Sequence, residues 1–184
     1  MIKHIRFLQA FLILALAALA LGPARAASTG DVLDQDAEAA LKALYAKAPG
    51  AKALSETAKG ILVFPNVTRA AFLLGAQGGD GVLFEKGMPA GHYRTGAFSA
   101  GLQAGVQSYG YALFFMTDED LNYLKTSTGW SLGVGPTIVI ADAGAAKDVS
   151  TLTGKKGVYG FIFSQKGLMA GLGLAGQKIG KIEK

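Results

Sequence analysis

The sequence predicts an α+β fold that is mainly β: a closed antiparallel β-barrel core with about three helices packed on its outside. From Gly60 onward, short apolar or alternating runs are separated by Gly, Asp, Pro or Asn, which is typical of consecutive strands. Glycines also recur inside these runs, where they allow a strongly coiled sheet to bend. So many glycines in one β region favour a closed barrel over a flat sheet.

Residues 1–26 are predicted to be a cleaved signal peptide. Lys3 and Arg6 precede an apolar run over 7–22, and the sequence Ala24-Arg25-Ala26 fits the small-x-small pattern of a cleavage site. The run is short for a membrane span, so an uncleaved anchor is the weaker alternative. We therefore expect an exported protein, periplasmic or secreted and able to attach peripherally to a membrane, with residues 27–184 as one domain.

Three segments have the pattern of helices. Residues 30–48 place apolar side chains at helical spacing, and Pro49-Gly50 ends the pattern. The polar face of this helix is acidic, so we expect the helix to cover the barrel rather than to meet anionic lipid. A short helix is predicted at about 51–58, and a third helix begins after Thr117 or Asp118, which would cap it.

Two strand segments bear on function. Residues 97–107 alternate between an apolar face and a small or polar face. The apolar face carries Phe98, Ala100, Leu102, Ala104 and Val106, and the other face carries Ser99, Gly101, Gln103, Gly105 and Gln107. Residues 168–176 are predicted to be the final strand. They contain a G-x-G-x-x-G spacing, but only eight residues follow it, too few for the helix and second strand of a dinucleotide-binding unit.

Charge is distributed unevenly along the chain. Residues 143–184 carry seven lysines against Asp148 and Glu183, which indicates an anionic partner, although an ordinary solvated surface gives the same pattern. Two segments rich in glycine and small polar residues, 85–96 and 142–157, are predicted to be loops that carry basic side chains.

The residues that could support catalysis are few. His92 lies in a Gly-rich segment with no carboxylate nearby in the sequence, so we expect it to be exposed. Asp80 fits a hairpin turn, and the acids at 118–120 fit a helix start. The chain has no Cys, which excludes disulfides and thiolate sites. We expect no catalytic residue, metal site, cofactor or nucleic-acid partner; the enzymatic alternative is a hydrolase using His92.

Four ordered blocks resemble the SYLF domain, a lipid-binding module of endocytic adaptors and of many exported bacterial proteins. The resemblance runs from about Asp31 to Ile182. Its blocks are AKGILVFPNVTRAAFLLGAQGGDGVLF (58–84), FSAGLQAGVQS (98–108), LGVGP (132–136) and GVYGFIFSQKGLMAGLGLAG (157–176). The resemblance implies a β-barrel core with helices on its outside, and non-catalytic binding of phosphoinositides or other anionic phospholipids.

The partners expected from this resemblance are anionic phospholipid headgroups at a membrane surface, with no protein partner indicated. Basic side chains on loops and C-terminal strands would contact the lipid phosphates. The candidate lipid-binding residues are Lys86, Arg94, Lys155, Lys156, Lys166 and Lys178. Two alternatives stay open: a small outer-membrane structural barrel, suggested by the alternation at 97–107, and a periplasmic protein-interaction module.

Overall fold

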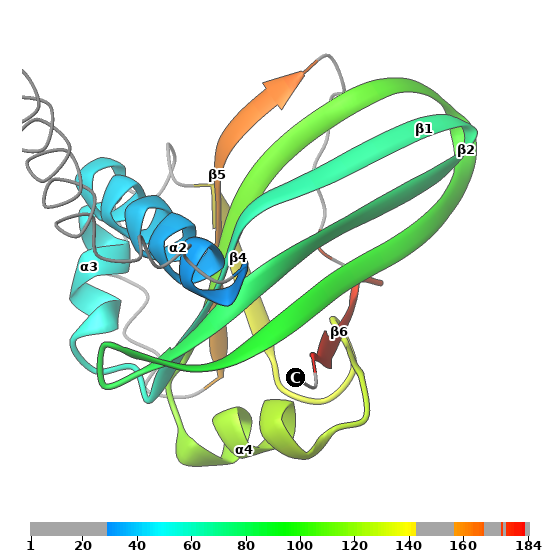
Figure 1. Cartoon of the computed structure of the whole chain (residues 1–184). Coiled ribbons are helices and arrows are strands. Elements are labelled where there is room, and N and C mark those ends of the chain that lie inside the picture. The colour runs from blue at the N-terminus through cyan, green and yellow to red at the C-terminus, as the bar shows by residue number, and fades with distance from the viewer. Residues whose placement is uncertain (1–28, 143–156, 168–173, 175, 183–184) are drawn as a thin grey trace, which may run out of the picture.

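The computed structural model describes residues 29–142, 157–167, 174 and 176–182 (Figure 1). The predicted signal peptide, Lys155, Lys156 and nearly all of the predicted strand 168–176 lie outside this part of the chain. In chain order the elements are α2 (Thr29–Lys47), α3 (Pro49–Ser55), β1 (Gly60–Glu85), β2 (Met88–Phe115), α4 (Asp118–Thr126), β3 (Trp130–Ser131), β4 (Ile138–Asp142), β5 (Val158–Gly167) and β6 (Lys178–Lys181). Within the described ranges, no helix combines the length and the apolar character needed to cross a membrane.

Strands β1 and β2 form one long antiparallel hairpin, whose register runs from Gly60 opposite Phe115 to Glu85 opposite Met88. Its turn is Lys86-Gly87, and both residues have positive φ, 51° and 77°. Such a two-residue turn matches the twist of the flanking strands. The prediction of a loop over 85–96 is therefore wrong: residues 88–96 belong to β2, where glycine and charged side chains obscured the strand pattern.

The hairpin folds over on itself, as Figure 1 shows. A Cβ atom built at Gly79 would lie 2.5 Å from the carbonyl oxygen of Asn66, and one at Gly81 would lie 2.5 Å from that of Val63. Two distant parts of β1 thus approach each other more closely than any side chain would allow. The glycines that suggested a coiled sheet serve this close approach.

The sheet is a strongly curled half-barrel. Strand β2 lies between β5 and β6, β4 adds to β5 and β3 adds to β6. The prediction of a closed antiparallel barrel is wrong in two respects. In the described part of the chain, β3 and β4 form the two edges and do not pair with each other, so the sheet is open. In addition, β4 runs parallel to β5, with Ile138 opposite Val158.

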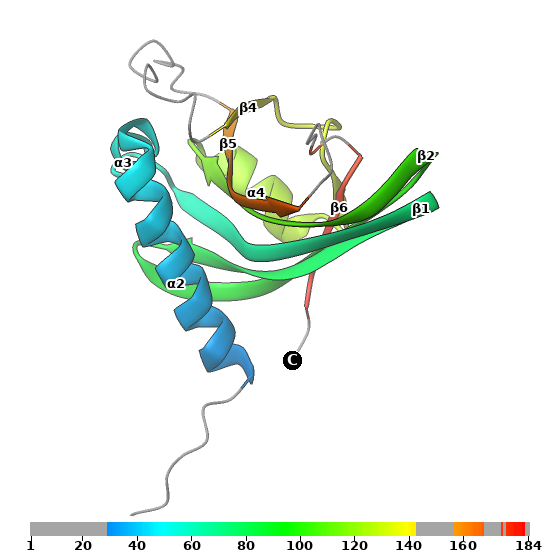
Figure 2. The same ribbon diagram turned by 90° about the horizontal axis from the view of Figure 1, so that it is seen from above.

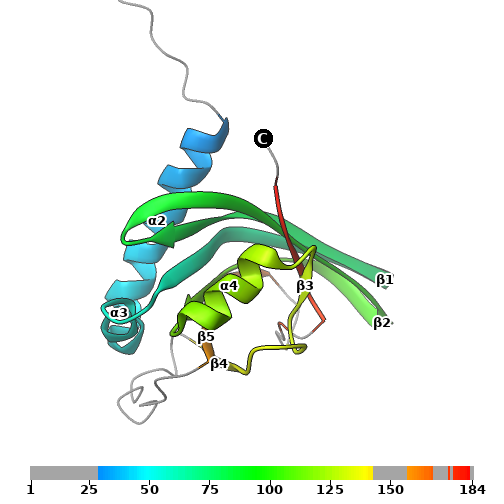
Figure 3. The same cartoon turned by 90° about the horizontal axis from the view of Figure 1, so that it is seen from below.

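Helix α4 lies across one end of the curled sheet: it is below the sheet in Figure 1, behind the strands when the molecule is seen from above (Figure 2), and in front of them from below (Figure 3). Its Leu121 and Leu124 are buried in the inner hydrophobic core together with Trp130 of β3. The helix therefore supplies apolar side chains to the inner core at this end of the sheet. The predicted N-cap is confirmed, because Thr117 Oγ1 accepts a hydrogen bond from the backbone N–H of Asp120 at 3.1 Å.

The other face of the sheet is covered by α2 and α3 (Figure 2). Along β2, Tyr111 and Leu113 point into the inner core, while Ala112 and Phe114 belong to an outer core with Ala37, Leu44 and Ala51 of the two helices. The expectation that the first helix covers the sheet is confirmed. Because both faces are buried there, the sequence reads as an unbroken apolar run rather than as an alternation.

Candidate functional site

Four of the six predicted basic residues lie in the described part of the chain, and they do not form one cluster. Arg94 and Lys178 lie together where β2 meets β6, because Arg94 pairs with Gly180 and Lys178 with Gly96. Lys166 lies on β5, along the other side of β2. Lys86 lies in the β1–β2 turn, at the border of a separate groove. Lys155 and Lys156 fall outside the described residues.

A groove of about 790 Å³ lies where β2 and β6 meet, and we call it the basic groove. Three cationic side chains line it, and none of its described lining residues is an Asp or a Glu. The cations are Arg94, Lys178 and Lys181. Their combined positive potential, with no nearby opposing charge among the lining residues, suits an anionic ligand. Sequence reasoning did not select Lys181 as a candidate, although Lys181 is one of the seven lysines of residues 143–184.

Strand β6, which carries Lys178 and Lys181, is held in place by a chain of hydrogen bonds between mostly buried side chains. Thr95 Oγ1 donates to Gln177 Oε1 at 2.8 Å, and Gln177 Nε2 donates to the Tyr109 hydroxyl at 2.9 Å. The Tyr109 hydroxyl then donates to Gln77 Oε1 at 3.1 Å. Gln177 immediately precedes β6 and is fully buried. The network therefore holds the beginning of β6 against β2, and with it the backbone of Lys178.

The aliphatic part of Lys178 rests on the loop between α4 and β3. A Cβ atom at Gly129 would lie 2.5 Å from Lys178 Cε, and Gly129 has a φ of 144°. The backbone conformation favours glycine at this position, and a side chain there would displace the end of Lys178. The loop thus supports the apolar part of Lys178, while the residue as a whole stays exposed.

Arg94 is held by an ion pair across the hairpin. Its Nε donates to Asp80 Oδ1 at 2.6 Å, and its Nη2 donates to Asp80 Oδ2 at 3.0 Å. The hydrogen bonds to Asp80, and then its negative charge, raise the pKa of the Arg94 guanidinium. Asp80 lies within β1, so the prediction that it occupies a hairpin turn is wrong. Part of the charge of Arg94 is already compensated, so the two lysines carry most of the unopposed charge of the groove.

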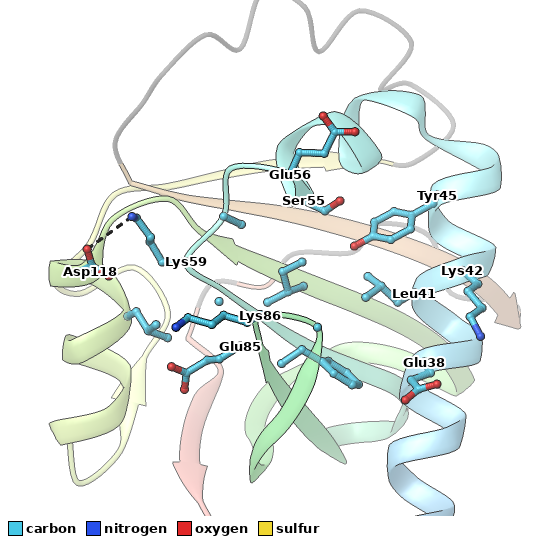
Figure 4. Close-up of a pocket in the computed structure, with 16 residues that line it drawn as sticks. Glu38, Leu41, Lys42, Tyr45, Ser55, Glu56, Lys59, Glu85, Lys86 and Asp118 are labelled. Carbon is cyan, nitrogen blue, oxygen red and sulfur yellow. Dashed lines mark ion pairs between the residues drawn. The ribbon is translucent and has the colours of Figure 1, made fainter.

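A second groove, of about 760 Å³, lies between α2, the beginning of β1 and the β1–β2 turn (Figure 4). Lys86 lines this groove together with other lysines, and the lining carboxylates are similar in number to the lysines. Lys59 Nζ lies 3.7 Å from Asp118 Oδ2, and Lys125 Nζ lies 2.7 Å from Glu85 Oε1, the latter beside Lys86 in the turn. Lys86 is thus surrounded by mixed charge, which favours an anion much less than the basic groove does.

His92 is not the exposed, partnerless side chain that the sequence suggested. Its Nε2 lies 2.9 Å from Asp34 Oδ1, and its side chain is only 13% exposed. The partner comes from the beginning of α2, far away in the sequence, which is why a local reading missed it. This contact joins α2 to the outer face of β2 and has an evident structural role.

One comparison with known proteins bears on this site. The family model described as Ysc84, Las17-binding protein actin regulator, matches residues 96–183. The matched range includes Lys166, Lys178 and Lys181 and begins two residues after Arg94. No curated protein matches the chain.

Proposed function

Because the chain belongs to the SYLF (Ysc84) domain family, we propose that it is a non-catalytic module that binds anionic phospholipids at a membrane surface. The observation that carries this proposal is the basic groove, where Arg94, Lys178 and Lys181 line one hollow without an acidic neighbour among the described lining residues. Phosphate groups of phospholipids, including phosphoinositides, are the anions that such a surface would meet.

The electrostatics suit weak, reversible attachment. Each lysine or arginine near an anionic membrane contributes on the order of 1 kcal/mol, and salt screens this attraction. Three groove cations, one of them paired with Asp80, would give a salt-sensitive interaction rather than a permanent anchor. This agrees with the proposed place of the protein, exported and peripheral on a membrane.

Charge reversal tests the proposal. We expect the double variant Lys178→Glu, Lys181→Glu to lose binding to mixed phosphatidylcholine and phosphatidylglycerol vesicles, measured by co-sedimentation at low salt. The matched control is the double variant Lys47→Glu, Lys52→Glu, which changes two exposed lysines of α2 and α3 that do not line the groove. If the test variant and the control lost the same amount of vesicle binding, the loss would be an effect of net charge alone. If neither lost binding, the groove would not be the binding site.

A protein partner is the second candidate function. The description of the family model names a Las17-binding actin regulator. The mixed-charge groove of Figure 4 combines apolar side chains of α2, Leu41 and Tyr45, with lysines and carboxylates. Such a mixture is common at the border of a protein interface. Binding of a protein partner that is unaffected by anionic vesicles and by Lys178→Glu would favour this function over the first.

A further inference from the structure

Four large apolar side chains are exposed midway along β1 and β2. In this stretch the hairpin bends over, away from α2 and α3 (Figures 1 and 2). They are Phe72, Leu74, Phe98 and Val106, which are 77%, 73%, 93% and 64% exposed. We call this set the apical patch. A concentration of exposed apolar side chains in one place marks an interaction surface more often than chance.

The hairpin register makes these side chains neighbours. Ala76 lies opposite Phe98, so Leu74, two residues along the strand, is the diagonal neighbour of Phe98 on the same face. In the same way, Ala70 lies opposite Val106, which makes Phe72 the diagonal neighbour of Val106.

A sharp bend in β1 joins these two pairs. A Cβ atom at Gly75 would lie 3.0 Å from the Cβ of Ala71, so the chain folds tightly around residues 72–74. Phe72 and Leu74 are strongly exposed at this bend. The apical patch is thus one projecting apolar surface rather than scattered single side chains.

The polarity of the sheet is reversed in this stretch. A sheet with one face in water normally points polar side chains outward and apolar ones inward. Here Thr95 and Gln107 of β2 are buried, 1% and 3% exposed, and Thr95 joins the hydrogen-bonded chain to Gln177. Phe98 and Val106 of the same strand are exposed. Contact with water does not account for this arrangement, whereas contact with an apolar environment does.

Cations flank the patch on two sides. Lys166 of β5 lies opposite Ser108, two residues from Val106 along β2. Lys178 of β6 lies opposite Gly96, two residues from Phe98. Because residues two apart in a strand share a face, both lysines border the apical patch. Apolar side chains with lysines at their border match the layers of an anionic bilayer, in which phosphate lies just outside the acyl chains.

We propose that the apical patch inserts into the interfacial layer of an anionic bilayer, with Lys166 and Lys178 at the level of the phosphates. The inference rests on the proposed function for the role of the lysines, and it adds a source of affinity that salt does not screen. Phe98 belongs to the apical patch and also lines the basic groove, so the surface that inserts adjoins the surface that binds headgroups.

A fluorescent label tests insertion directly. The chain has no Cys, so Phe98→Cys creates a single attachment point for an environment-sensitive fluorophore. The matched control is Asn122→Cys, an exposed position on α4. With phosphatidylcholine and phosphatidylglycerol vesicles, we expect the label at 98 to shift to the blue and to be quenched by brominated lipid, and the label at 122 to do neither. Unchanged fluorescence of the buried Trp130 would verify the fold in both proteins.

A second variant measures the contribution to affinity. Leu74→Ser combined with Phe98→Ser removes two exposed side chains, so the fold should remain intact. We expect vesicle affinity to fall about tenfold or more at high salt as well as at low salt, because burial of one large apolar side chain is worth about that factor.

Several results would overturn the inference. For the labelled protein, these results are a label at position 98 whose fluorescence does not shift on bound vesicles, or a label that is already shifted before vesicles are added. For the double variant with Leu74→Ser and Phe98→Ser, they are vesicle binding equal to that of the wild type, or the loss of a self-association that the wild type shows. Equal insertion into pure phosphatidylcholine would support the patch and contradict the proposed headgroup site. A wild-type protein that binds no vesicle would overturn both.

Discussion

Arg94 and Asp80 lie directly opposite each other on β2 and β1, and two hydrogen bonds of 2.6 and 3.0 Å join the guanidinium to the carboxylate. Both side chains are partly exposed, so the pair contributes little to stability. Its main consequence is electrostatic, because a carboxylate lies beside one of the three cations of the basic groove.

We therefore predict that Asp80→Asn strengthens binding to anionic vesicles. The change leaves the positive charge of Arg94 uncompensated, and one additional charge near the membrane raises affinity about fivefold. A titration with phosphatidylglycerol-containing vesicles measures it. Asp118→Asn is the control, since Asp118 pairs with Lys59 and does not line the basic groove. Affinity that is equal to or weaker than that of the wild type would contradict the assignment of Arg94 to the site.

Gly81→Ala should destabilise the protein by about 2 kcal/mol or more, because the new Cβ would lie 2.5 Å from the carbonyl oxygen of Val63 and overpacking of this kind is costly. Urea unfolding followed by circular dichroism gives the free energy of unfolding. Gly180→Ala is the matched control, since no atom lies within 4 Å of its Cβ position. If both substitutions had the same small effect, the account of the folded-over hairpin would be wrong.

The N-cap of α4 gives a smaller expected effect. Thr117→Ala removes the hydrogen bond from the Asp120 backbone N–H and should lower the free energy of unfolding by about 1 kcal/mol. Thr126→Ala removes only an exposed hydrogen bond to the Asn122 carbonyl and should change the stability by less than about 0.5 kcal/mol. A Thr117 variant as stable as the Thr126 variant would show that the cap is dispensable.

Alkaline pH should unfold the protein through its buried tyrosines. Burial raises the pKa of Tyr111 well above 10.0, and burial also raises the pKa of Tyr109. Above pH 10 the unfolded chain loses phenolic protons that the folded chain retains, so stability is complete below that pH and falls as the pH rises further. Tyr111→Phe should flatten this decline in urea unfolding measured across alkaline pH. An unchanged slope would contradict the prediction.

The sequence predicted the helices and the general β character well, because these follow from local patterns. Thr117 caps α4 as expected, and the break at Pro49 separates α2 from α3. Closure of the sheet could not be predicted in this way. It depends on which strands pair at the edges. The two-residue β3 is too short to give a pattern, and the apolar run of β4 does not tell that it pairs in parallel with β5.

The candidate site was predicted in part, for a similar reason. Lys178 and Arg94 were recognised as basic residues, but only the pairing of β6 with β2 brings them and Lys181 into one groove. The partner of His92 was missed because Asp34 is distant in the sequence. The alternation at Phe98 and Val106 was visible, yet it does not tell which face is buried.

The central claim is that anionic headgroups are the ligand of the basic groove. The most direct test is co-sedimentation of the protein, purified after secretion from an expression host, with pure phosphatidylcholine vesicles and with vesicles that also contain phosphatidylglycerol, at low and at high salt. The account predicts clear binding to the anionic vesicles at low salt, with a marked decrease at high salt and much weaker binding to the neutral vesicles. Equal binding to both kinds of vesicle, or binding to neither, would contradict it.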